Sequence, residues 1–397
     1  MIFVRKNILM SYKLSMLLLF LSSMHMWTFW GIERIVMILS FFTSISFYLF
    51  CKSFFVITNK RIISVFLLSL FFLYLALVVE NVTGVLGAIV SISIFSVLIF
   101  LKDYFRVKLL VFILRCFSAL LSVSLLYFLA CCLLDISLPF IYTDYADQYY
   151  FKNYYFFLTY DANWFFVLPR FQSVFVEPGH LGMVLSLLLY TQKFDLKKWY
   201  NIIMMISAIL SFSLAAYVLI VIGIIMINVI RNRNSIFYIL IAISFAFMSI
   251  CIFVDRLDQE NMFNKLIVER LTIENGDIAG NNRFSNDFEK DFKRKINTTD
   301  KWFGWQPNFS IYGGGNAGYK RYIATNGIIG VVVFVLFYLS CCKGYGIYSY
   351  SLLLLYLLSF IQRSYPDSEF ELIPFICGVS FLQLINVNSV FQKRITG

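Results

Sequence analysis

Residues 62–101 read IISVFLLSLFFLYLALVVENVTGVLGAIVSISIFSVLIFL. Only Glu80 and Asn81 separate its two apolar runs, Ile62–Val79 and Val82–Leu101. Each run has about 20 residues, the length at which an α-helix crosses the hydrocarbon core of a bilayer. The stretch therefore predicts a transmembrane hairpin of two helices.

The rest of the chain has the same character. Of the 397 residues, 60% are hydrophobic and 14% are charged, whereas an average soluble domain carries about 25% charged residues. This composition excludes a soluble globular enzyme, and the 6 Pro and 19 Gly exclude a disordered or fibrous chain. Other apolar runs predict further spans, at Leu14–Trp30, Ile35–Phe50, Leu109–Leu134, Leu181–Tyr190, Ile236–Val254, Tyr322–Leu339, Ser351–Ile361 and Leu372–Ile385.

One apolar stretch, Tyr200–Ile230, has basic residues at both ends, so both ends should face the cytoplasm. A helix of that length reaches only about 46 Å, which is too short for two full crossings. We expect a pair of short helices with a break at Ser211-Phe212-Ser213. Irregular backbone at membrane depth is tolerated only where it is buried in protein or lines a cavity, so the break indicates a functional cavity.

The net charge of +11 sorts by side of the membrane. In the predicted topology the cytoplasmic side carries +16 and the external side −5, with both termini cytoplasmic. The basic character therefore reflects orientation in a membrane, and we expect no nucleic acid partner. The fold class is an all-α polytopic membrane protein with about ten full transmembrane helices, a short or broken pair, and a large external loop. Its regions are residues 1–134, 135–180, 181–254 (with the broken pair at 200–230), 255–321 and 322–397.

No nucleotide-binding, zinc-protease or serine-hydrolase motif is present, so we expect no cofactor. The chain has two histidines, and its eight cysteines form no C-x-x-C pair. A metal site is therefore not expected, and the cysteines are best interpreted as small hydrophobic residues within helices.

The strongest local feature is PRFQSVFVEPGHLG at 169–182, where the first external loop re-enters the membrane. Arg170 suits a diphosphate because its planar guanidinium binds oxyanions bidentately. Glu177 is a candidate general base if desolvation raises its pKa; alternatively it only orients an arginine. His180 is a weaker catalytic candidate.

A second group of candidates comes from the long external segment and the short turn near the C-terminus. We predict substrate binding for four residues: Arg283, Asn316, Arg321 and Arg363. For Lys320, beside Arg321, anchoring of a helix end at the lipid headgroups is the better interpretation.

These features together resemble the O-antigen polymerase and ligase superfamily of the bacterial inner membrane. Three parts carry the resemblance: the Arg170 to Gly182 stretch, the break at Ser211–Ser213, and the pattern Arg283, Gly304, Asn316 and Gly327-Ile328-Ile329-Gly330. The ligase branch has a histidine where this chain places Asn316, so the resemblance favours the polymerase (Wzy) class.

The resemblance implies an inner-membrane enzyme that joins oligosaccharide repeat units linked to undecaprenyl diphosphate at the periplasmic face. The lipid diphosphate would be the leaving group, so no nucleotide is needed. Membrane lipid and a chain-length regulator are further candidate partners. Two alternatives remain: a ligase that transfers the glycan to lipid A–core, and a flippase or exporter that binds the lipid-linked glycan without chemistry.

Overall fold

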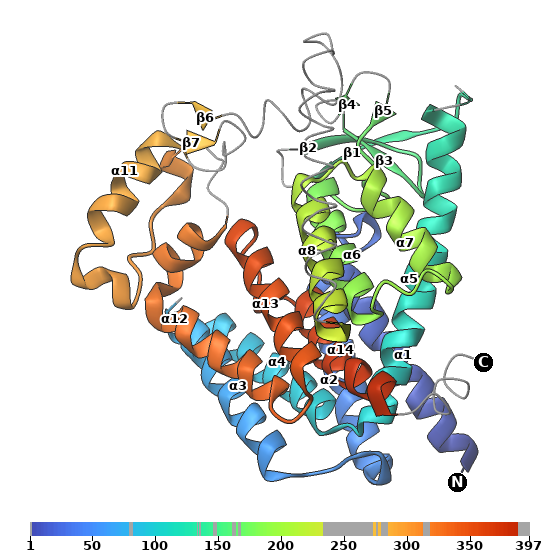
Figure 1. The fold of residues 1–397 in the computed structure, drawn as a ribbon, viewed down its shortest axis with the longest axis vertical. Helices are drawn as coiled ribbons and strands as arrows, with labels where there is room; N and C mark the ends of the chain where they lie inside the picture. Colours follow the sequence, from blue (N-terminus) through green and yellow to red (C-terminus); the bar gives the residue numbers. More distant parts are fainter. Residues whose placement is uncertain are drawn as a thin grey trace.

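The computed structural model describes residues 2–78, 82–132, 134, 136–145, 149–160, 164–165, 168–232, 273–274, 277–278, 285–312 and 318–387. This part of the chain is mostly helical, in agreement with the predicted helical membrane protein (Figure 1). Six of the described helices are long and apolar enough to cross a membrane: α2 (Glu33–Phe50), α3 (Asn59–Val78), α4 (Val82–Phe100), α5 (Asp103–Cys132), α8 (Leu214–Arg231) and α12 (Tyr319–Cys342). The predicted hairpin is confirmed, because α3 packs against α4.

Helix α6 (Pro178–Thr191) lies at the centre of a group of helices from the later part of the chain, and every one of its residues is buried. It packs against α7 (Trp199–Leu210), α8, α13 (Ile347–Gln362) and α14 (Glu369–Val387). Helix α14 also packs against α5 and α1, which joins the two halves of the chain. The start of α1 and the end of α14 lie at the same end of the bundle (Figure 1).

The prediction for the first span is wrong at both ends. Helix α1 runs from Ile2 to Ser23 and not from Leu14 to Trp30. His25 has φ of +55°, which helical backbone does not allow. The next residues form a short 3₁₀ turn, Trp27–Phe29, and the Trp27 N–H donates to the carbonyl of Val174. The apolar run therefore continues past the helix because it packs against the segment that contains Val174.

The predicted break in the 200–230 stretch is confirmed. Helix α7 ends at Leu210 and α8 begins at Leu214, with Phe212 at φ of +45° between them. Ser213 caps α8 by accepting a hydrogen bond from the Ala216 N–H at 3.4 Å. Helix α6 packs directly on this break at Gly182.

The segments predicted to be external loops contain strands that the all-α prediction did not include. Strands β1 (Ile141–Tyr145), β2 (Tyr149–Asn153) and β3 (Leu158–Thr159) form an antiparallel sheet in which Thr143 faces Phe151. Two short hairpins are also present, β4–β5 (Trp164–Phe165 and Leu168–Pro169) and β6–β7 (Ile273–Glu274 and Asp277–Ile278). Helix α11 (Asn286–Lys295) lies in the predicted loop 255–321, whereas the predicted span Ile236–Val254 lies outside the described residues.

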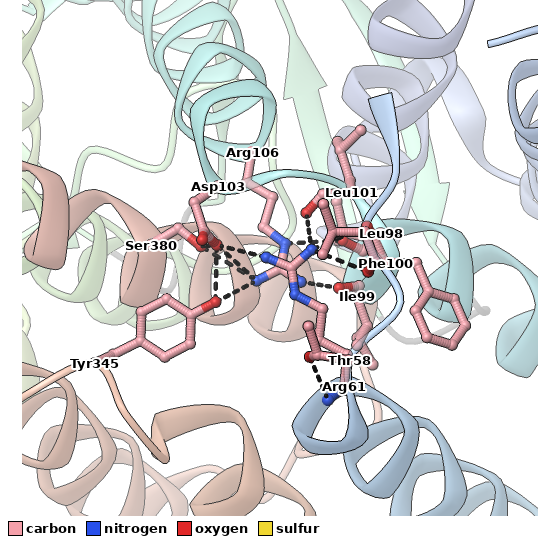
Figure 2. Close-up of polar contacts among 11 residues, drawn as sticks. Thr58, Arg61, Leu98, Ile99, Phe100, Leu101, Asp103, Arg106, Tyr345 and Ser380 are labelled. Carbon is pink, nitrogen blue, oxygen red and sulfur yellow. Dashed lines mark hydrogen bonds and ion pairs between the residues drawn. The ribbon is translucent and has the colours of Figure 1, made fainter. Parts of the chain in front are cut away.

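One buried arginine, Arg106, and one partly buried arginine, Arg61, close the C-terminal end of α4 (Figure 2). Arg106 of α5 donates to the carbonyls of Leu98, at 3.0 Å, and Ile99. Arg61 of α3 donates to the carbonyls of Phe100 and Leu101, each at 2.9 Å. Carbonyls in the last turn of a helix have no partner within the helix, so these contacts tie α3, α4 and α5 together.

Gly182 provides a test of the packing at the helix break. A Cβ there would lie 2.6 Å from Ser211 Oγ and 2.9 Å from Ala216 Cβ. We expect Gly182→Ala to destabilise the protein by about 1–3 kcal/mol through overpacking, measured as a lower midpoint of thermal unfolding in detergent. Gly87→Ala in α4 is the matched control, because no atom lies within 4 Å of its Cβ position. Equal midpoints for the two variants would contradict this packing.

Candidate functional site

The segment between β5 and α6, residues 170–177, is pinned between several helices. The Phe171 ring packs edge-on against Phe128 of α5, with 5.3 Å between the ring centroids. The Phe171 N–H donates to the Leu210 carbonyl at the end of α7, at 2.9 Å. Phe175 packs on Phe117, nearer the middle of α5. The segment therefore descends along α5 before it turns into α6.

Arg170 lies at the helix break. Its Nε donates to the carbonyl of Ser211 at 3.0 Å, so Arg170 and Phe171 cap successive carbonyls at the end of α7. Its Nη2 also lies close to Gly179, 3.7 Å from where a Cβ would stand. The hydrogen bond to Ser211 fixes the direction in which the planar guanidinium faces.

Glu177 forms an ion pair with Arg363, the first residue after α13. Arg363 Nη1 donates to Glu177 Oε2 at 2.5 Å, and Nη2 donates to Oε1. The contact is bidentate, which fixes the plane of the guanidinium. The Arg363 side chain is 11% exposed and that of Glu177 is 47% exposed, so the carboxylate lies at the open side of the site.

Gly179 allows the two arginines to meet. A Cβ at Gly179 would lie only 3.0 Å from Arg363 Nη2, and the same position faces Arg170 Nη2. The guanidinium groups thus converge on the first turn of α6, whose free N–H groups and dipole also favour anions. We call Arg170, Glu177, Gly179, His180 and Arg363 the arginine site.

His180 forms the inner wall of the arginine site and is 7% exposed. Its ring packs edge-on against Phe370 at 4.3 Å and near Tyr365 at 5.5 Å. Its Nε2 has no hydrogen-bond partner within the described part of the chain. The imidazole is therefore held by aromatic packing, with one buried polar atom that has no partner among the described residues.

The pKa of Glu177 decides between its two predicted roles, general base and orienting group for an arginine. Burial raises the pKa of this carboxyl, but the Arg363 guanidinium that it accepts from lowers the pKa more, to about 2, and His180 and Arg170 act in the same direction. A carboxylate with so low a pKa is a weak proton acceptor. The geometry favours the alternative in which Glu177 orients an arginine, and that arginine is Arg363.

Not all of the other predicted site residues lie at the arginine site. Arg321 is exposed, and its guanidinium lies over the Phe309 ring at 4.5 Å; no described contact brings it to the Glu177–Arg363 pair. Lys320 forms an ion pair with Glu289 of α11 at 2.5 Å. Arg283 and Asn316 lie outside the described residues.

Gly304 and, in α12, Gly327 have a packing role. Gly304 has φ of +84° and Gly327 has φ of +66°, both in the left-handed region that favours glycine. A Cβ at Gly304 would collide with the Thr325 carbonyl, and one at Gly327 would collide with the Trp302 carbonyl. The two backbones therefore cross in direct contact where α12 kinks.

Sequence reasoning missed the acidic residues beside Arg363. The turn into α14 carries Asp367 and Glu369, and Glu371 follows with an Oε1 that has no hydrogen-bond partner among the described residues. Burial raises the pKa of the Asp367 carboxyl. Three acids at and just before the start of an apolar helix were a visible signal in the sequence. In the same described part, no three His, Cys, Asp or Glu side chains gather as they would for a metal ion.

No known protein family, no curated protein and no solved structure matches this chain. The chemistry open to the arginine site therefore follows from its own geometry. Two guanidinium groups, a helix N-terminus and a buried imidazole can together hold a ligand that carries several negative charges.

The Glu177–Arg363 pair predicts how stability changes with pH. Because the Glu177 pKa lies below that of free Glu, about 4.3, the pair stabilises fully above that pH and its contribution falls as the pH drops towards 2. We expect Glu177→Gln to lower the thermal midpoint at pH 7, because it leaves Arg363 without its counter-charge. The difference from wild type should shrink by pH 3. Asp287→Asn, an exposed carboxylate of α11, should follow the wild type at both pH values, and a gap that does not change with pH would contradict the pair.

Proposed function

We propose that this protein polymerises oligosaccharide repeat units that are linked to undecaprenyl diphosphate. The proposed location is the periplasmic face of the bacterial inner membrane, with both chain termini in the cytoplasm. The product is O-antigen or a related surface polysaccharide. The observation that carries the proposal is the convergence of Arg170 and Arg363 on the N-terminus of α6 at Gly179.

The proposed reaction forms one bond at the anomeric carbon and breaks another. A hydroxyl oxygen of the incoming unit bonds to the anomeric carbon of the growing chain, and the bond between that carbon and the diphosphate oxygen breaks. The hydroxyl proton leaves, and undecaprenyl diphosphate departs with one more negative charge than it had in the donor. Catalysis therefore depends on groups that stabilise charge on the departing diphosphate.

The arginine site contains groups suited to this charge. Arg170 and Arg363 each present a planar guanidinium, and neither loses its charge at physiological pH. Both are held in place before any ligand arrives, Arg170 by the Ser211 carbonyl and Arg363 by Glu177. Such preorganisation lowers the cost of stabilising the transition state. In this proposal Glu177 is a positioning residue for Arg363.

His180 and its aromatic neighbours support the same assignment. The Nε2 atom of His180 has no partner among the described side chains and backbone, so we assign it a hydrogen bond to the substrate. Tyr365, 39% exposed, lies beside His180 on the open side. Exposed aromatic rings pack well on the apolar faces of sugars, which suits a glycan substrate.

The first test is the lipopolysaccharide banding pattern of a strain that lacks this gene, compared with its parent. We expect the ladder to collapse to core plus a single repeat unit, because polymerisation stops while transfer of single units to the core continues. Loss of all repeat units from the core would favour the ligase or the flippase instead. An unchanged ladder would contradict all three.

Substitution of the arginines tests the assignment of residues. We expect Arg170→Ala and Arg363→Ala to lower chain extension by about 10²–10³-fold, as for the loss of one charge-stabilising donor. Arg170→Lys should extend chains at an intermediate rate, because it keeps the charge and one donor but loses the planar fork. The readout is the ladder of the complemented strain, with protein in the membrane measured by immunoblot.

Arg294→Ala is the matched control for these variants. Arg294 is also an arginine in an ion pair, with Asp291 at 2.6 Å, but its side chain is 73% exposed on α11. We expect a normal ladder from this variant. Normal extension by Arg170→Ala at wild-type protein levels would rule out a role for Arg170 in binding the diphosphate.

A further inference from the structure

A cavity of about 340 Å³ lies at the other end of α13 and α14 from the arginine site. Arg363 follows the last residue of α13, whereas Tyr345, just before the first, lines the cavity. Likewise, Phe370 at the start of α14 contacts His180, while Gln383 near its end lines the cavity. The length of α13 separates the two sites by about 24 Å.

The walls of this cavity are strongly basic. Five of the residues that line it carry a positive charge and one carries a negative charge, which gives a net +4. They come from α3, the α4–α5 turn, α5 and the α12–α13 turn: Lys60, Arg61, Lys102, Arg106 and Lys343, with Asp103 as the acid.

The two arginines and the acid are already fully engaged with one another and with the backbone (Figure 2). Arg61 and Arg106 cap α4. Asp103 Oδ1 accepts from Arg61 at 3.0 Å, from the Tyr345 hydroxyl at 2.8 Å and from Ser380 at 2.9 Å. This single carboxylate offsets the charge of only one of the two arginines and leaves no counter-charge for the lysines.

The lysines form the open side of the cavity. Lys102 donates to the Ser53 carbonyl at 2.6 Å. Lys60 and Lys343 are exposed, and the side-chain ammonium of neither has a hydrogen bond or ion pair to another described residue. Lys60 Nζ lies against the α12–α13 turn, 2.8 Å from where a Cβ of Gly344 would stand. The ammonium of Lys60 is thus held next to the residue that follows Lys343.

The position of Lys60 makes the excess of positive charge in the cavity less favourable still. Lys60 and Arg61 lie in the first turn of α3, where the helix dipole favours anions and disfavours cations. An anion in the cavity would interact favourably with the helix N-terminus as well as with the lysines. The volume of the cavity is within the range of about 300–1,000 Å³ found for small-molecule sites.

We propose that this cavity is a binding site for a phosphate group, held between Lys60 and Lys343. A phosphate offers several acceptor oxygens and up to two negative charges, which matches cations that approach from different sides. Its source is either the headgroup of an anionic lipid or a soluble phosphate compound. Bound phosphate links α3 to the α12–α13 turn. This site is independent of the arginine site and of glycan polymerisation.

The test is ligand-dependent thermal unfolding of the full-length protein, which needs no polymerase activity. One arm adds inorganic pyrophosphate to protein in a neutral detergent, with ionic strength held constant by chloride. The other arm compares nanodiscs of phosphatidylcholine alone with nanodiscs that also contain phosphatidylglycerol. A ligand that binds only the folded state raises the unfolding midpoint, and we expect a saturable rise of at least about 3 °C in one arm.

The variants are Lys60→Gln, Lys343→Gln and the double substitution, with Lys197→Gln as the matched control. Lys197 is an exposed lysine that does not line the cavity. We expect the control to respond as the wild type does, and the double substitution to need at least about tenfold more ligand for the same rise. A response to pyrophosphate identifies a soluble phosphate compound, and a response to phosphatidylglycerol alone identifies a lipid headgroup. The proposal is overturned if neither arm stabilises the wild type. It is also overturned if the double variant and both single variants respond to the ligand as the wild type does.

Discussion

The capping of helix ends by arginine side chains is the interaction on which this structure depends. A helix that ends in or near lipid leaves carbonyls that water cannot reach, and each unsatisfied group costs several kcal/mol. At the end of α4, Arg106 and Arg61 satisfy four consecutive carbonyls, those of residues 98–101. Because the two arginines belong to α5 and α3, closing one helix end also joins three helices. Asp103 then extends the network to Tyr345 and to Ser380 of α14.

The same solution recurs at the break between α7 and α8. Arg170 and Phe171 satisfy the carbonyls of Ser211 and Leu210, and in doing so they bring the segment 170–177 onto α6. Arg170 therefore has a structural and a proposed chemical role in one place. A side chain that caps a helix is held rigidly, which is the property that an oxyanion-binding group needs. The glycines at 179 and 182 let the arginines and the break approach α6 this closely.

The break at Ser211–Ser213 could be predicted because it follows from arithmetic: the length of the apolar run and the charges at its ends allow no unbroken helix. The pairing of Glu177 with Arg363 could not be predicted from the sequence, because it joins residues 186 positions apart and depends on where α13 ends. Arg61 and Arg106 were predictable only as positive charges on one side of the membrane; their carbonyl partners depend on tertiary packing. Strand β2, Tyr149–Asn153, was missed because its aromatic residues also fit the belt found at membrane surfaces.

Helix lengths explain why the arginine site suits a ligand tethered to lipid. Helices α6, α7 and α13 have 14, 12 and 16 residues, so they span only about 21, 18 and 24 Å, less than the hydrocarbon thickness of about 30 Å. All three have one end at the arginine site, whereas α5, with 30 residues, reaches about 45 Å. Phe171, next to Arg170, contacts Phe128 four residues before the end of α5, so the arginine site lies below that end. A diphosphate whose lipid tail stays in the bilayer can reach this position from the side of the helices, as the proposed lipid-linked donor requires.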